Sequence, residues 1–370
     1  MKNKESINLP QFFFIIIQTQ IGVGVLSLPY TMYKASKTDG WISLMIAGVF
    51  VQLILTMYYF LLKKFNGSNI FDIAQVTAGK IIGKFLICLY LFYFLLVGIM
   101  ILSLFNKIIA TWILPRTPSW AIGGMFSFLA AALCREGIRV IGRFYTLVTP
   151  LLLLLVFLIT YTLKDANIYF LFPIGKEGIK DILLGSKEAV IAMLGFEMIL
   201  VIYSLANGEH KRKYLIITGA NALITLLYTY LIIINFIYYS PEEIAVVPEP
   251  MLFILKSYSF KIIERTDLFF LSIWIISVFT SFVSYLYMSA KSAKKLIPKG
   301  KNRFYVNLFA AVIFLVASGI KPITGLTDKL SQLMSYISLL FIIMIPFLLL
   351  VFSYVFKRKQ KGGSSRFDYH

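Results

Sequence analysis

The chain has 370 residues, of which 59% are hydrophobic and 14% are charged. Soluble domains usually contain about 45–50% apolar and about 25% charged residues, so this composition excludes a soluble protein and indicates a polytopic membrane protein. The net charge of +19 does not predict nucleic-acid binding, because Lys and Arg lie mainly in short loops between apolar segments, where membrane topology places them.

Apolar segments follow one another along almost the whole chain. We expect ten membrane spans, at about 12–33, 41–62, 81–113, 119–134, 144–163, 185–206, 214–239, 267–290, 304–319 and 331–356. A polar leader, 1–11, precedes them, and a basic and polar tail, 357–370, follows. The sequence does not decide whether 362–370 is native. An even number of spans places both termini on one side of the membrane. The excess of Lys and Arg in the loops of that side predicts that it is the cytoplasmic side.

The first span contains the stretch 22–29, with the sequence GVGVLSLP. Relative to alanine, glycine disfavours a helix interior by about 1 kcal/mol and proline by about 3 kcal/mol, so we expect the helix to be interrupted here. Irregular backbone at membrane depth is tolerated where it is buried in protein or lines a cavity. The freed amide and carbonyl groups beside Gly22 and Gly24 suit the carboxylate and ammonium of a ligand. The alternative is a packing face of small residues between helices.

The sixth span carries a second candidate interruption, Gly195-Phe196-Glu197. A charged side chain inside a span costs at least about 2.5 kcal/mol, so Glu197 is a functional candidate. Three roles remain open for it: pairing with a ligand ammonium, carrying a proton, or holding the interrupted helix together. Phe196 is predicted to cover a pocket, and Leu194 to line its apolar side.

Two further spans contribute candidates. In the eighth span, Ser281 and Tyr285 lie one helical turn apart and can face one ligand. In the third span, Val97 lies at mid-depth and could form a pocket wall. Both observations have a simpler interpretation, because hydroxyl and small side chains in membrane helices commonly join one helix to another.

The spans show a weak internal repeat. Spans 1 and 6 have glycine interruptions, spans 3 and 8 are long, spans 4 and 9 are short, and spans 5 and 10 contain proline. Because five is odd, two five-span units would enter the membrane from opposite sides. We therefore predict an all-α membrane protein with a 5+5 inverted repeat, in which repeat 1 (12–163) and repeat 2 (185–356) are joined by an extracytoplasmic loop (164–184) and enclose a ligand between the interrupted spans.

Catalytic and metal-binding motifs are missing from the sequence, which has no Walker loop, zinc motif or nucleophile elbow. Cys88 and Cys134 do not have metal-ligand spacing. We expect neither an enzyme nor a cofactor or metal.

Residues 18–30 (QTQIGVGVLSLPY), followed by 39–43 (DGWIS), resemble the B subunit of the GerA-type spore germinant receptors, and 195–197 (GFE) fits the same family. The resemblance extends over the whole span region. It implies membership of the amino acid–polyamine–organocation transporter superfamily, a leucine-transporter-like fold with broken spans 1 and 6, and a place in the inner membrane of the bacterial endospore.

The resemblance also implies a role. A B subunit binds a nutrient germinant, often an amino acid, and signals together with a membrane-embedded A subunit and a lipoprotein C subunit. By fold analogy, the implied pocket consists of Gly22, Gly24, Val25, Val97, Leu194, Phe196, Ser281 and Tyr285, to which its position adds Glu197. The alternatives are an ion-coupled amino-acid permease and a scaffold whose ligand binds elsewhere in the complex. The absence of a cation between Arg143 and Lys164 in the fifth span counts against proton coupling.

Overall fold

The computed structural model describes residues 5–258, 264–319 and 326–355, and in 326–332 it describes the backbone only. The regular elements in these ranges are helices, with one isolated bridge between Ile7 and Ala206. The fold is therefore all-helical, as predicted. The predicted tail, 357–370, lies outside the described residues.

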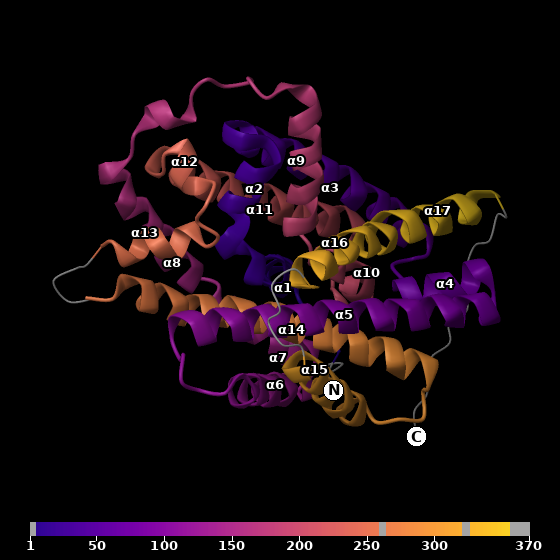
Figure 1. Ribbon diagram of the computed structural model, residues 1–370. Helices are drawn as coiled ribbons and strands as arrows, with labels where there is room; N and C mark the ends of the chain where they lie inside the picture. The colour runs from indigo at the N-terminus through magenta and orange to yellow at the C-terminus, as the bar shows by residue number, and fades with distance from the viewer. Residues whose placement is uncertain (1–4, 259–263, 320–325, 356–370) are drawn as a thin grey trace.

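The first half of the chain forms both short and long helices (Figure 1). They are α1 (Leu9–Gln20), the 3-10 turn η1 (Val23–Ser27), α2 (Leu28–Ser36), η2 (Lys37–Asp39), α3 (Gly40–Lys64), α4 (Ile70–Ala78), α5 (Lys80–Trp112), α6 (Ser119–Arg135), α7 (Ile138–Val148), α8 (Leu151–Thr160), η3 (Tyr161–Asp165) and η4 (Ile168–Leu171).

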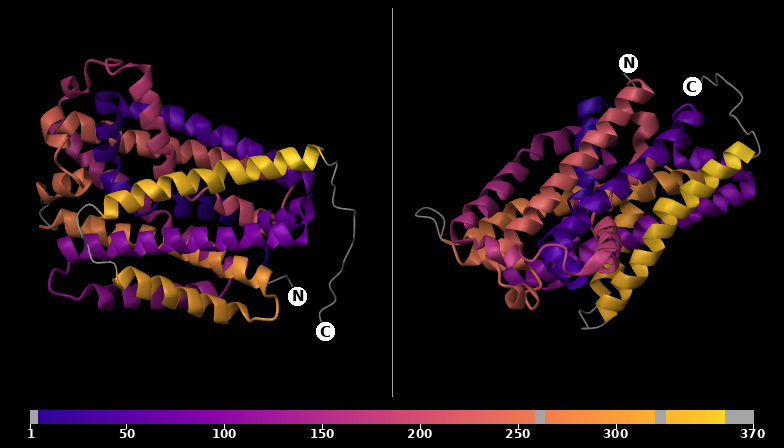
Figure 2. Two further views of the ribbon diagram at one scale, coloured as in Figure 1. Left: turned by 45° about the vertical axis from the view of Figure 1, so that its right-hand side comes forward. Right: turned by 90° about the horizontal axis from the view of Figure 1, so that it is seen from above.

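The helices of the second half pack into the same bundle as those of the first half (Figure 2). Its elements are α9 (Gly178–Ala192), α10 (Met198–Ile202), η5 (Tyr203–Leu205), α11 (His210–Tyr238), α12 (Pro241–Ile244), α13 (Pro250–Lys256), α14 (Thr266–Leu296), α15 (Asn302–Gly319), α16 (Leu326–Leu339), the π-helical turn η6 (Leu340–Met344) and α17 (Ile345–Val355).

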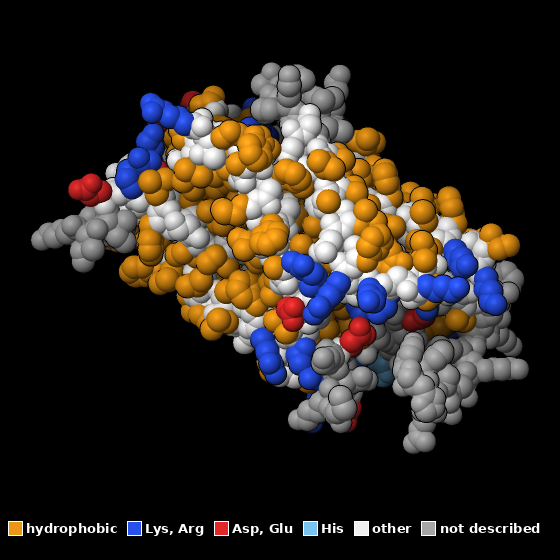
Figure 3. Space-filling model, turned by 90° about the horizontal axis from the view of Figure 1, so that it is seen from below, with side chains coloured by type: hydrophobic (Ala, Val, Ile, Leu, Met, Phe, Trp, Pro, Cys, Tyr) orange, Lys and Arg blue, Asp and Glu red, His pale blue; other side chains and the backbone are white. Residues whose placement is uncertain are grey.

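The centre of the bundle is the pair α5 and α14, which lie side by side along most of their length (Figure 1). On one side, α3 packs against α9 and α11, and on the other α15 packs against α6. Most of α14 is buried, because it carries apolar and small hydroxyl side chains on every face. Hydrophobic side chains cover much of the surface in Figure 3, and many Lys and Arg side chains gather toward one part of it.

Seven helical segments of the described chain are long and apolar enough to cross a membrane. They are Val23–Lys64, Lys80–Trp112, Ile138–Asp165, His210–Tyr238, Thr266–Leu296, Asn302–Gly319 and Leu333–Val355. The apolar helix α6 is shorter, and α1, α9 and α10 are shorter still. Ten crossings and the inverted repeat therefore stay predictions.

Several predicted boundaries are matched closely, and the differences have local causes. The segments predicted at 81–113 and 214–239 correspond to α5 and α11. The segment 144–163 is divided into α7 and α8 at Pro150, because proline breaks the hydrogen bonding of a helix interior. Helix α14 runs past the predicted end at 290, because Lys294 and Lys295 in its last turn complement the helix dipole.

The leader is packed against the bundle from Glu5 onward. Helix α1 already begins at Leu9, where Asn8 and Gln11 form a capping box. The buried Ile7 donates its N–H to the Leu205 carbonyl (2.9 Å) and accepts from the Asn207 N–H (2.8 Å). This segment is thus part of the fold.

Candidate functional site

The C-terminal end of α1 leaves carbonyl groups without partners within the helix, and hydroxyl side chains from other helices fill that gap. Ser281 on α14 donates to the Thr19 carbonyl (3.0 Å), and Tyr228 on α11 donates to the Gln20 carbonyl (2.9 Å). These carbonyls are therefore already hydrogen bonded, and the Ser281 hydroxyl holds the end of α1.

The segment between α1 and α2, referred to below as the first interruption, contains two glycines in different surroundings. Gly22 is extended, and a Cβ atom there would lie 3.1 Å from the Ser281 hydroxyl oxygen. A Cβ atom on Gly24 would meet no atom of the described structure within 4 Å. Gly22 thus lets α14 approach the backbone, whereas Gly24 borders open space.

The second interruption follows α9, whose helical bonding ends at Met193. Gly195 has φ +121°, a conformation that favours glycine, and a Cβ atom there would lie 2.5 Å from the Thr19 carbonyl oxygen. Gln20 also donates its side-chain amide to the Met193 carbonyl (3.0 Å). The two interruptions therefore contact each other directly.

The carboxylate of Glu197 is buried at this contact. Its Oε2 accepts from the Gly195 N–H (2.8 Å). Its Oε1 accepts from the hydroxyls of Tyr285 on α14 (2.6 Å) and Tyr93 on α5 (3.1 Å). Of the three roles open for Glu197, this geometry favours the structural one, since the carboxylate joins α5 and α14 to the second interruption.

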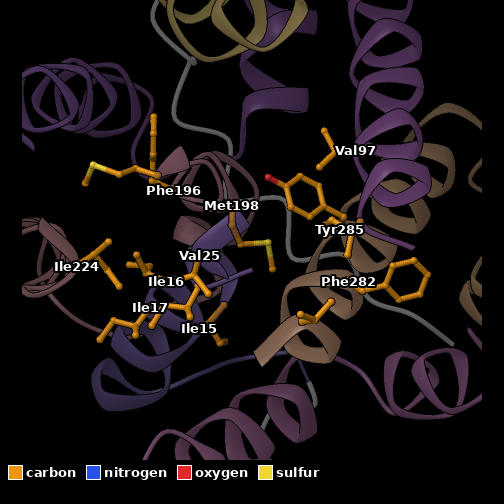
Figure 4. Close-up of a cluster of buried hydrophobic side chains, with 14 of the residues drawn as sticks. Ile15, Ile16, Ile17, Val25, Val97, Phe196, Met198, Ile224, Phe282 and Tyr285 are labelled. Atoms are coloured by element: carbon orange, nitrogen blue, oxygen red, sulfur yellow. The ribbon is translucent and has the colours of Figure 1, made fainter. Parts of the chain in front are cut away.

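A cavity of about 300 Å³ lies beside the first interruption. Six of the nine predicted site residues line it: Gly22, Gly24, Val97, Leu194, Ser281 and Tyr285. Val97 and Tyr285 lie next to each other in Figure 4. The structure thus brings together residues from four separate predicted spans.

The other three predicted residues are not among those that line this cavity. Val25 faces a small apolar cavity bordered by Trp274. Phe196 is fully buried and packs near the ring of Tyr58 (6.2 Å between ring centroids), so it does not cover the pocket. Glu197 lies behind the wall, bonded as described above.

Among the polar side chains of the cavity that the sequence did not single out, two carry an amide or carboxylate oxygen, Gln20 and Glu188. The Oε1 atom of Gln20 is buried and accepts no hydrogen bond from the described residues. Glu188 on α9 places a partly exposed carboxylate at the same cavity. Gln20 belongs to the 18–30 motif, and Glu188 lies inside the predicted span 185–206. Their positions in the sequence were compatible with a binding site but did not distinguish them from their neighbours.

The cavity is suited to binding rather than to catalysis. Its walls are largely apolar, with an unpaired amide oxygen and a carboxylate that can accept hydrogen bonds from a ligand N–H or ammonium group. The described residues contain no group of three His, Cys, Asp or Glu that could hold a metal ion.

The fold indicates which class of membrane protein the chain belongs to. It is similar to that of a Na⁺-coupled sialic acid symporter in its substrate-bound outward-open state, with a TM-score of 0.63, 12% sequence identity, and coverage of 91% of this chain and 79% of the symporter. At this identity the similarity shows the fold alone. With its apolar helices, the chain is a multi-pass membrane protein with a transporter-like fold.

Within that class, the chain belongs to the spore germination protein family, whose model matches residues 6–325. Spore germination protein GerQB of Bacillus cereus is 32% identical over 265 residues, which cover 71% of this chain and 72% of GerQB. Spore germination protein A2 of Bacillus subtilis (strain 168) is 29% identical over 296 residues, covering 78% of this chain and 80% of that protein.

Spore germination protein YndE of Bacillus subtilis (strain 168) is 24% identical over 361 residues, which cover 96% of this chain and 98% of YndE. These findings confirm the resemblance to the GerA-type family. The relatives are spore germination proteins and the structural neighbour is a symporter, so this family is not one of enzymes, as predicted.

Proposed function

We propose that the chain is the nutrient-sensing subunit of a spore germination receptor, and that it binds an amino acid in the cavity between the two helix interruptions. The observation that carries this proposal is the pair of acceptors at that cavity, beside the open backbone of Gly24. They are the buried Gln20 Oε1 atom, which has no partner among the described residues, and the partly exposed Glu188 carboxylate. An ammonium group supplies the donors that these oxygens need.

The signal would follow from a conformational shift. We propose that α1 with α2, and α9 with α10, form the interrupted spans 1 and 6 of a ten-span inverted repeat. A ligand that binds one arrangement of these spans more tightly than another changes their populations. Partner subunits, a membrane-embedded A subunit and a lipoprotein C subunit, would respond to this change in the spore inner membrane, with both termini of the chain in the cytoplasm.

The test is a thermal-shift panel of amino acids, sugars and nucleosides on the purified chain, repeated on Gly24→Leu. Leucine at this position extends into the cavity without a backbone penalty, because Gly24 does not have a positive φ. We expect an amino acid to stabilise the native chain and to lose its effect in Gly24→Leu. Gly319→Leu is the matched control, since its Cβ also meets open space but lies outside the cavity.

An amino-acid response that persists in Gly24→Leu, or a panel without any response, would contradict the proposal. A response to sugars or nucleosides alone would keep the cavity and change the ligand class.

The second candidate function is an ion-coupled amino-acid permease, which the symporter-like fold supports. Uptake of a labelled amino acid into proteoliposomes by this chain alone distinguishes the two. The receptor proposal expects binding without uptake, and accumulation driven by an ion gradient would favour the permease.

A further inference from the structure

A second and larger cavity, of about 730 Å³, lies between α4, the start of α5, η5 and the end of α14. Five lysines line it: Lys80, Lys84, Lys291, Lys294 and Lys295. Positive charge in short loops is ordinary for a membrane protein. Here, however, the lysines of two separate helices converge on one concavity.

The acidic side chains around this cavity do not balance the lysines. Glu5 pairs with Lys291 (2.9 Å), and Asp72 pairs with Lys295. Lys80, Lys84 and Lys294 form no ion pair with any acid of the described chain. An anion that enters the cavity therefore meets three uncompensated ammonium groups.

The charges of the lysines affect the pKa of the Glu5 carboxyl group. Partial burial raises the pKa of this carboxyl group, but the neighbouring charges of Lys291 and Lys294 outweigh burial and hold its pKa below the ordinary value. The surroundings thus favour negative charge.

The start of α5 adds to the excess of positive charge around the cavity. Its N-cap is Gly79, which offers no side-chain hydrogen bond to the free N–H groups of the first turn. Lys80 and Lys84 stand at this positive end of the helix dipole, where basic residues are unfavourable. At the end of α14, by contrast, lysines complement the dipole. A bound anion would relieve the repulsion at α5.

Tyr287 gives an independent sign of a missing ligand. Its side chain lines the cavity and is 1% exposed, yet its buried hydroxyl has no hydrogen-bond partner in the described part of the chain. An unsatisfied buried hydroxyl costs about 1–3 kcal/mol. A phosphate oxygen in the cavity would accept this hydrogen bond.

Apolar side chains next to the lysines point to the source of the anion. Ile81, Ile82 and Phe85 alternate with Lys80 and Lys84 in the first turns of α5 and are strongly exposed. In a membrane protein such side chains contact acyl chains. Basic pockets between membrane helices are typical sites for anionic lipid headgroups.

We propose that this cavity binds a phosphate-bearing anion, supplied by the headgroup of an anionic phospholipid whose acyl chains lie along the first turns of α5. Lys80, Lys84 and Lys294 contact the phosphate, and the Tyr287 hydroxyl donates to it. The bound lipid ties α5 to α14, the two helices that also hold Glu197.

Native mass spectrometry of the full chain in a neutral detergent tests this, with dioleoyl phosphatidylglycerol as the probe and dioleoyl phosphatidylcholine as the neutral comparison. We expect Lys80→Gln with Lys84→Gln to weaken phosphatidylglycerol binding at least about tenfold. The matched control is Lys211→Gln with Arg212→Gln, which removes the same charge from exposed positions outside the cavity. It should change binding less than about twofold.

Tyr287→Phe provides a second variant with the same packing. Removing the unsatisfied hydroxyl should raise the melting temperature of the lipid-free chain and reduce the stabilisation by phosphatidylglycerol. Glu5→Gln removes a competing carboxylate and should tighten binding.

Inorganic phosphate and glycerol 3-phosphate separate the two sources of phosphate. Weak competition by both supports the lipid, whereas competition equal to that of phosphatidylglycerol supports the same site with a soluble anion. Equal phosphatidylglycerol binding by the native chain, the Lys80/Lys84 variant and Tyr287→Phe would overturn the proposal.

Discussion

The segment between α1 and α2 (the first interruption) contacts the segment between α9 and α10 (the second interruption), yet the glycines of the two segments have different surroundings. At the second interruption, Gly195 is pressed against the Thr19 carbonyl, and the Glu197 carboxylate occupies its N–H group. At the first, Gly24 borders a cavity, and the neighbouring Gln20 keeps an unpaired oxygen. A glycine between two helices can therefore allow either close packing or access to a cavity, and its surroundings decide which.

This difference assigns separate tasks to the two segments. The second interruption is a structural support, because the Glu197 carboxylate joins the Gly195 N–H to the tyrosine hydroxyls of α5 and α14. The first interruption borders free space and has an unpaired acceptor oxygen, so a ligand that binds there can donate a stabilising hydrogen bond to it. Substitutions at the second should lower stability, and substitutions at the first should lower affinity.

The largest expected effect is that of Gly195→Ala. The added Cβ meets backbone atoms of Thr19 within 2.5–2.7 Å at a positive φ, so the two interruptions must separate. We expect a loss of at least about 3 kcal/mol in the free energy of unfolding, measured by chemical denaturation in detergent. Gly219→Ala is the control, because its nearest neighbour, Phe13 Cε2, is 3.9 Å away. Equal stability of the two variants would refute the close contact.

Glu197→Gln comes next. A glutamine side chain cannot accept from the Gly195 N–H and both tyrosine hydroxyls with the same geometry, so one buried donor loses its partner. The expected cost is about 1–3 kcal/mol of stability, with unchanged affinity of the folded fraction for its amino acid. An affinity loss without a stability loss would instead make Glu197 a ligand-binding residue.

Glu188→Gln should have the smallest effect, and on affinity alone. It removes the charge of a partly exposed carboxylate at the cavity, which would weaken binding of an ammonium-bearing ligand about tenfold. Calorimetric titration with an amino acid and with its analogue lacking the amino group checks this. The analogue should bind both forms equally, and a loss shared by both ligands would show that the charge does not recognise the ammonium.

Local patterns in the sequence predicted the elements of the fold well. Long apolar runs predicted α5 and α11 nearly to their ends and the start of α14, and the glycines and proline of 22–29 marked the end of α1. These features depend on propensities of neighbouring residues, which are readable in one chain.

The roles within the site depended on partners distant in the sequence. Glu197 is held by Tyr93 and Tyr285, which lie 104 and 88 residues away. The unpaired oxygen of Gln20 arises because its amide nitrogen is used by Met193, a contact that only the packed bundle creates. The same holds for Asp39, whose buried carboxylate accepts from the Gly175 and Glu177 N–H groups.

Amide hydrogen exchange of the purified chain tests the division of tasks most directly, measured with and without the amino acid that gives the largest thermal shift. The account predicts that binding slows exchange in residues 21–29, and that residues 193–197 are already protected without the ligand and change little. Slower exchange in 193–197 with no change in 21–29 would contradict it.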